Sequence, residues 1–216
     1  MFSSELWNNS GVVVPDDVTL AFLSNEGSET DASSYTFTGK SFGDTATDRR
    51  IFVGVYGLDN SGSTITTSTV TVGGVSATKV VEVTNDTSIN GVSAIWQADV
   101  PSGTSGTVVI AFSTTIIKMG YALWRVTGGV DEKATASSTS SNFTLSLDVN
   151  DNGGAIGYAG NRDTPTWTWT GLTEDFEGTA GSAKHSGASD TFASGGSKTV
   201  GANCSGSGHV TVFASF

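Results

Sequence analysis

The sequence lacks the residues and segments that mark several classes of protein. Among 216 residues there is one cysteine, Cys204, so no intramolecular disulfide can form, and we predict a small buried thiol. No apolar run approaches the roughly 18 residues that span a bilayer. The first ten residues contain neither a basic nor an apolar region, so we expect no signal peptide. These shortages argue against a disulfide framework and against a membrane protein.

Charge is scarce and biased toward one sign. Charged residues make up 14% of the chain, and 10 Lys and Arg against 21 Asp and Glu give a net charge of −11. Binding to nucleic acid without sequence preference needs a basic face, which these few scattered cations do not supply. An anionic membrane surface is disfavoured for the same reason. We therefore expect neither a nucleic-acid nor a membrane partner.

Motifs for catalysis and cofactor binding are also missing. There is no Gly-x-Ser-x-Gly elbow and no phosphate loop. The two histidines, His185 and His209, have no Cys or acid at zinc-ligand spacing. Asp148–Gly153 matches the opening of a calcium loop, but Ala159 stands where the closing Glu should be, and a hairpin turn requires the same residues. We predict no metal and no cofactor, with calcium at Asp148–Gly153 as the alternative left open.

The chain is rich in short apolar runs separated by Gly, Ser, Thr, Asn and Asp. Residues 50–58 are apolar or small on both faces of an extended chain, which indicates a strand covered on both sides. Runs at 107–112 and 119–124 are predicted to join the same core. The pattern predicts an all-β fold, an antiparallel β-sandwich that is jelly-roll-like or Ig-like. The predicted core includes Ile51, Val53, Val55, Val108, Ile110 and Phe112.

Four stretches carry more specific predictions. Residues 69–83 indicate a hairpin through a Gly-Gly turn. Residues 92–100 alternate between apolar and polar side chains, which predicts a half-buried strand. Residues 178–196 are rich in Gly, Ser and Ala and show no period. The strand at 209–216 ends on Phe216, whose side chain we predict to be buried.

The N-terminal residues differ from the rest, and we divide the chain into an arm, 1–32, and a sandwich domain, 33–216. Residues 16–23 fit a short strand or one helical turn, and the stretch after them is polar. Phe2, Leu6 and Trp7 are apolar and precede a polar stretch, so we predict that they anchor the chain to a partner. In Asp48-Arg49-Arg50, an Arg that closes the strand end on a nearby acid is favoured over a partner-binding cluster.

A series of turns and strand edges carries a resemblance to a known group of proteins. The series runs through Tyr35–Gly39, Asp48–Arg50, Thr71–Gly74, Ser76–Thr78, Ser93–Trp96, Val100–Val108, Trp169–Gly171, Thr173–Glu174 and Phe213–Phe216. It resembles β-sandwich structural proteins of tailed bacteriophages and prophages, found as head decorations, head fibres or tail-fibre components. The likeness covers about residues 33–216, and it implies a fold and a virion setting but no catalytic residues.

The resemblance implies a non-enzymatic virion structural protein, assembled in the host cytoplasm and displayed on the virion surface. Its expected partners are capsid or tail proteins and sister copies, with a trimer favoured. One alternative is a glycan-binding module for host-surface recognition. Another is a glycosidase with Glu174 and Glu177 as its paired carboxylates. Trp167, Trp169, Glu174 and Glu177 form the candidate glycan or partner surface.

Overall fold

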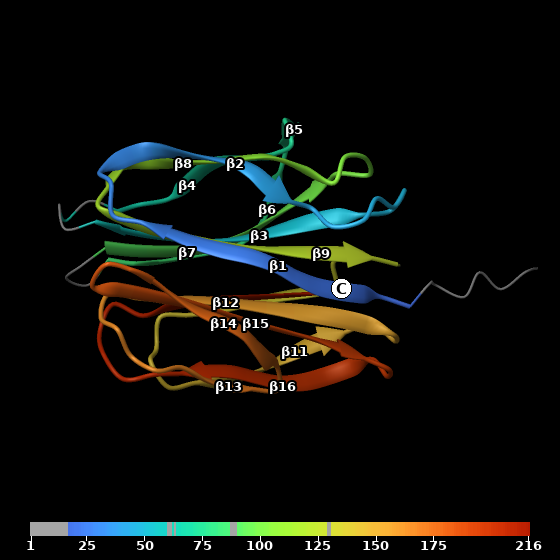
Figure 1. Cartoon of the computed structure of the whole chain (residues 1–216). Coiled ribbons are helices and arrows are strands. Elements are labelled where there is room, and N and C mark those ends of the chain that lie inside the picture. The colour runs from blue at the N-terminus through green and yellow to red at the C-terminus, as the bar shows by residue number, and fades with distance from the viewer. Residues whose placement is uncertain (1–16, 60–61, 63, 87–89, 129–130) are drawn as a thin grey trace, which may run out of the picture.

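The protein is all-β, as the sequence predicts. The computed structural model describes residues 17–59, 62, 64–86, 90–128 and 131–216. Within these ranges the chain forms seventeen strands and no helix. The strands pair antiparallel in four sheets, stacked as four layers (Figure 1). The first nine strands build the N-terminal sandwich, and the other eight build the C-terminal sandwich.

Each sandwich has an outer sheet that faces solvent and an inner sheet that faces the other sandwich. In order across each sheet, the N-terminal inner sheet is β1 (Thr19–Ser28), β9 (Lys118–Thr127), β3 (Arg50–Asp59), β7 (Asn90–Asp99) and β6 (Thr78–Asn85), and its outer sheet is β2 (Ala32–Ser41), β8 (Ser105–Ile116), β4 (Thr67–Val72) and β5 (Val75–Ser76). The C-terminal inner sheet is β10 (Ala134–Ser138), β17 (Val210–Ser215), β12 (Gly153–Asn161), β15 (Ala183–Phe192) and β14 (Thr173–Ala180), and its outer sheet is β11 (Thr144–Val149), β16 (Gly196–Asn203) and β13 (Thr168–Thr170).

The N-terminal sandwich is wound like a long hairpin rolled into two sheets. β1 pairs with β9, β2 with β8, β3 with β7 and β4 with β5, so the pairs are nested along the chain. Further pairing of β9 with β3 and of β8 with β4 closes the sheets. This nested pairing is the jelly-roll arrangement. Of the two predicted sandwich types, the jelly roll is therefore the one that the chain adopts.

The C-terminal sandwich repeats this winding. β10 pairs with β17, β11 with β16 and β12 with β15. The inner sheets then have the same order of equivalent strands, β1-β9-β3-β7-β6 and β10-β17-β12-β15-β14. The chain is thus two copies of one topology, joined through their inner sheets. The sequence patterns predict a single sandwich and do not reveal this duplication.

The predicted boundary between arm and body is wrong for residues 17–32. β1 lies in this range and pairs with its neighbour β9 from Thr19 to Ser28, with one bulge between Phe22 and Ser24. β1 is an edge strand held by backbone pairing, so the polar side chains that suggest a flexible stretch are compatible with it. Residues 1–16, with the predicted anchor at Phe2, Leu6 and Trp7, lie outside the described residues.

Three apolar cores fill the spaces between the four layers. The first core lies inside the N-terminal sandwich and contains all six residues of the predicted core, which confirms that prediction. A second core joins the two inner sheets, and we call this contact the seam. The third core lies inside the C-terminal sandwich. Phe216 is buried in the seam at 1% exposure, as predicted.

Aromatic side chains fill the seam. The ring of Phe22 on β1 stacks on Phe176 of β14 at 5.1 Å, and Trp124 meets Tyr158 edge to face at 6.2 Å. The predicted half-buried strand at 92–100 is wrong for this reason. β7 is buried on both faces, because the second sandwich covers the side that a lone sandwich would leave in water.

β15 has no period in the sequence, yet it is a ten-residue buried strand. Its small residues make room for large rings from neighbouring strands. A Cβ at Gly187 would lie 2.5 Å from the ring of Phe176 and 2.6 Å from that of Trp124. The apolar side chains that cover β15 thus come from β14 and β9, and this explains why β15 itself shows no apolar pattern.

The sequence predicts that an Arg closes the end of this strand on a nearby acid, and Arg49 is not that residue. Its guanidinium is 1% exposed and donates to six backbone carbonyls at 2.6–3.2 Å. These carbonyls belong to two loops, residues 42–44 and 100–103. The neighbouring Arg50 makes the predicted kind of contact, with Asp99 at 3.0 Å. Arg49 therefore ties the two loops together at this end of the N-terminal sandwich.

Candidate functional site

The four residues of the candidate surface lie together at one side of the C-terminal sandwich. Trp167 and Trp169 belong to the approach to β13 and to β13 itself, while Glu174 and Glu177 lie on β14. The indoles of Trp167 and Trp169 stack at 6.2 Å. β13 and β14 are edge strands of the outer and inner sheets, so this surface spans the side of the sandwich.

Glu177 acts as a bridge between the two sheets. Its Oε1 accepts a hydrogen bond from the backbone N–H of Trp167 at 2.7 Å, and its Oε2 meets Nζ of Lys184 at 2.5 Å. The N-terminal sandwich contains a similar bridge, in which Glu82 accepts the backbone N–H of Thr67 at 2.8 Å. Because both oxygens of Glu177 are engaged, this carboxylate fits a structural role better than that of a nucleophile.

Glu174 is the exposed acid of the surface. Partial burial and, after it, the negative charge of Glu177 raise the pKa of Glu174. Asp175, between them, occupies a bulge in β14 and accepts a hydrogen bond from Nε1 of Trp124 at 2.7 Å. The bulge therefore directs Asp175 toward the seam.

The two tryptophans differ in what they can present to a ligand. Trp167 is 3% exposed and lies against the ring of His209 at 4.9 Å, so it offers no platform to a sugar. Trp169 is half-buried, and its Nε1 donates to Ser186 Oγ at 2.9 Å. One half-open indole beside the exposed carboxylate of Glu174 can contribute to weak binding, and this is the chemistry that the surface offers.

Cys204 and His209 form a polar contact that the sequence analysis did not propose. Cys204 Sγ lies 3.3 Å from His209 Nδ1, and Thr211 Oγ1 lies 2.7 Å from the other ring nitrogen. Burial raises the pKa of Cys204 to about 11 and lowers that of His209 to about 4. The pair is therefore neutral at pH 7, and Cys204 is a buried thiol as predicted. The sequence did contain a sign of this contact, because Cys204 and His209 flank a short Ser/Gly-rich loop that can bring them together.

The other histidine, His185, also makes a buried polar contact, and this one lies at the seam. Its Nδ1 lies 3.0 Å from the hydroxyl of Tyr158, and no side-chain or backbone partner meets Nε2 in the described part of the chain. Burial lowers the pKa of His185 to about 4. No sequence pattern could place His185 there, because the contact depends on the packing of the two sandwiches.

The stretch Asp148–Gly153 contains the end of β11, the turn that follows it and the first residue of β12. Asn152 has a φ of 54°, and Gly153 N–H bonds to Asn150 O at 3.1 Å. Asp151 accepts the backbone N–H of Gly195 at 2.6 Å, which uses the carboxylate to fasten a neighbouring loop. In the described ranges no group of three or more His, Cys, Asp or Glu residues is placed to hold a metal ion.

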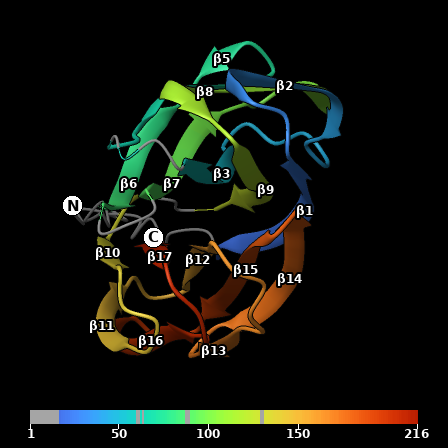
Figure 2. The same cartoon turned by 90° about the vertical axis from the view of Figure 1, so that its left-hand side faces the viewer.

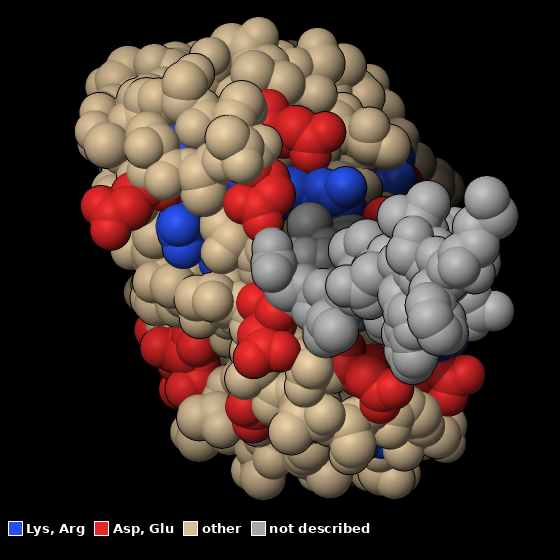
Figure 3. All heavy atoms as spheres, turned by 90° about the vertical axis from the view of Figure 1, so that its right-hand side faces the viewer, with Lys and Arg blue, Asp and Glu red and all other residues tan. Residues whose placement is uncertain are grey.

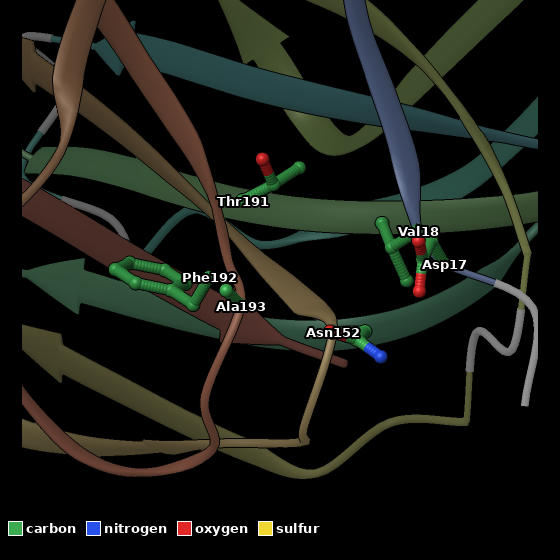
Figure 4. Close-up of a pocket in the computed structure, with 6 residues that line it drawn as sticks. All are labelled: Asp17, Val18, Asn152, Thr191, Phe192 and Ala193. Atoms are coloured by element: carbon green, nitrogen blue, oxygen red, sulfur yellow. The ribbon is translucent and has the colours of Figure 1, made fainter.

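A pocket of about 220 Å³ lies at one end of the seam (Figure 4). Asp17 and Val18 line it from the start of β1, and Thr191 and Phe192 line it from the end of β15. Across it, Val18 N–H bonds to Asn152 O at 3.0 Å. With one carboxylate and no cation in its lining, the pocket shows no arrangement for acid–base chemistry.

Comparisons with known proteins give no assignment. No family model, no curated protein and no solved structure matches the chain. Among the described residues, no helix has the length and apolar character needed to cross a membrane.

Proposed function

We propose that the chain is a non-enzymatic structural protein of a tailed-phage particle, displayed on the particle surface as a decoration or fibre component. The construction of the body supports this most directly. Two jelly rolls are joined back to back by a seam of buried aromatic side chains, so the molecule is a rigid block. Jelly rolls recur in viral capsid proteins and in lectins, and this fold-level analogy agrees with the resemblance of the turns and strand edges.

The distribution of charge gives further support. β4, β5 and β8 of the N-terminal outer sheet contain no charged residue, and β2 contributes only Lys40. On the face shown in Figure 3, charged side chains gather around the middle of the molecule, and its two ends are mostly neutral. Apart from Gly39, the exposed residues of β2, β4 and β8 are Ser and Thr. A neutral, hydroxyl-rich surface combined with a net charge of −11 favours solubility over non-specific adhesion, as a protein displayed in many copies requires.

The test is to locate the protein in purified particles. We expect a tagged full-length chain to co-purify with particles through a density gradient and to be visible on their surface by immunogold labelling. Deletion of residues 1–12, which ends before β1, is expected to leave a folded body that no longer joins the particle. Particles that lack the full-length chain would contradict the proposal. Normal incorporation of the truncated chain would contradict only the anchor at Phe2, Leu6 and Trp7.

A glycan-binding module is the second candidate, and the half-exposed indole of Trp169 beside Glu174 favours it. Binding of host-surface glycans by the purified chain should then fall at least tenfold in Trp169→Ala and persist in Thr168→Ala, which alters an exposed neighbour. Joint replacement of Glu174 and Glu177 by Gln tests the glycosidase alternative. We expect no glycan cleavage by the wild type and normal particle incorporation of this double variant.

A further inference from the structure

The edges of the four sheets are not equally protected. Exposed edge strands invite pairing with other chains, and proteins prevent this with bulges or very short strands. Of the eight edge strands, β1, β2, β6 and β14 contain a register shift against their neighbour. β5 and β13 have two and three residues. Only β10 and β11 combine a continuous register with five or six paired residues in the described part of the chain.

β11 is the more accessible of these two edges. β10 belongs to an inner sheet and packs beside β6 of the other sandwich (Figure 2). β11 belongs to the outer sheet, where no second sandwich covers it, although Ser215 Oγ of β17 donates a hydrogen bond to the carbonyl of Asp148 at one end of the strand. Its equivalent in the N-terminal sandwich is β2, which has two register shifts and carries Lys40. The protection present in one copy of the topology is thus absent from the other.

The core behind β11 is also incompletely covered. Ala134 and Ala136 on β10, together with Phe143 and Leu145 at the start of β11, are only half-buried, although all four pack against the third core. On β16, the strand next to β11, Val200 and Ala202 belong to the same core and are fully buried. An added strand along β11 would cover part of this open apolar strip, which favours association.

We propose that β11 is the edge at which two copies of this chain pair, antiparallel and about a two-fold axis. Opposite residues in an antiparallel pair point to the same face, so an outward residue must meet an outward residue. A two-fold axis at Ser146 satisfies this condition for the whole strand. It places Ser146 opposite its own copy, Leu145 opposite Leu147, and Thr144 opposite Asp148.

This register suits a second copy in particular. Asp148 is the one charged residue of β11, and antiparallel pairing sets it against Thr144 rather than against another carboxylate. Two chains that each carry a net charge of −11 can therefore pair along β11 without placing one carboxylate opposite another. The pairing joins two three-stranded outer sheets into one sheet of six strands, and it covers Leu145, which is half-buried in the single chain, while Leu147 is already buried there.

A cysteine placed on the axis tests this pairing in the purified full-length chain. Ser146→Cys should form a disulfide-linked dimer under mild oxidation, because Cα atoms of opposite residues lie about 4.5–5.5 Å apart, within the range that a disulfide spans. The matched control is Thr199→Cys. Thr199 pairs with Ser146 inside the sheet and is exposed on the same face, yet its copy would lie roughly 14 Å away, three strand spacings off. The wild type controls for Cys204, which is 7% exposed.

Light scattering provides a measurement that does not depend on cross-linking. The wild type should have twice the 22.1 kDa monomer mass at concentrations where Ser146→Cys cross-links. Ser146→Lys sets two like charges opposite each other and should weaken association about fivefold, while Thr199→Lys should not. A monomeric mass, a trimeric mass, or equal cross-linking at both positions would overturn the proposal. These results leave the particle role untouched, because they concern the isolated chain.

Discussion

Arg49 is the side chain whose replacement should be most informative about stability. We consider Arg49→Met, which keeps most of the side-chain volume and removes all five N–H donors. Six carbonyls then lose the Arg49 donor, although that of Asp44 keeps another, from Arg125 Nε. The carbonyls of Gly43, Asp44, Ser102 and Gly103 are only partly buried, so they can accept hydrogen bonds from water instead. The contacts to the carbonyls of Val100 and Phe42 are buried, so these two oxygens lose a partner without replacement.

The size of the effect follows from those two carbonyls. A buried polar group left without a partner costs about 1–3 kcal/mol. Two such groups, with some loss of order in both loops, give a destabilisation of roughly 3–5 kcal/mol. The loop at 42–44 also holds Phe42, which is 1% exposed, so its packing should loosen as well. For a chain of this length the expected fall in Tm is about 10 °C.

Urea unfolding monitored by tryptophan fluorescence measures this effect. Arg50→Met is the matched control, because Arg50 is the next residue and makes a partly exposed ion pair with Asp99, worth at most about 1 kcal/mol. Arg49→Lys should fall between Met and the wild type, because an ammonium cannot reach both loops. A loss below about 1 kcal/mol in Arg49→Met, or equal losses at Arg49 and Arg50, would refute the role assigned to the guanidinium.

Three further predictions concern the seam and the chain end. The folded-state pKa values of His185 and His209 lie near 4, below the ordinary 6.5. As the pH falls, the unfolded chain therefore takes up protons before the folded chain does. The free energy of unfolding should fall by up to about 3 kcal/mol per histidine between pH 6.5 and pH 4. Urea midpoints across this range measure the fall, which should shrink in His185→Gln. Gly160→Ala places a Cβ 2.0 Å from the Tyr56 ring, and a loss of at least 1–3 kcal/mol is expected, roughly that of an overpacked core, measured by thermal unfolding. Deletion of residues 213–216 removes two buried phenylalanines and should give insoluble protein, whereas a soluble product with the wild-type circular dichroism spectrum would contradict their role.

The sequence was informative wherever a side chain packs inside its own sandwich. Residues 50–58 show two apolar faces and are buried on both, and the Gly73-Gly74 turn adopts the positive φ values that its glycines allow. Alternation at 209–216 correctly indicated a buried terminal strand. These features depend on local period and turn chemistry, which a single sequence displays.

The features that sequence reasoning missed arise from contact between the two sandwiches. β15 has no apolar period because Phe176 and Trp124 cover it from other strands. β7 was expected to be half-buried because its polar Ser93 gave no sign of the second layer that covers it. The four residues of the candidate surface do lie together in the structure, on β14 and on and before β13. The burial of Trp167 and the engagement of Glu177 depend on backbone groups that no residue pattern displays.

The nested winding has a consequence for how the chain folds. Each inner sheet is completed by the last strand of its sandwich, β9 or β17, and that strand enters the middle of the sheet rather than its edge. β1 must wait for β9, about a hundred residues later, and the seam must wait for β17. Pairing between such distant segments makes folding slow and leaves unpaired edges exposed meanwhile. During synthesis the N-terminal sandwich can close once residue 127 has emerged, while its inner face stays uncovered until the second roll is complete.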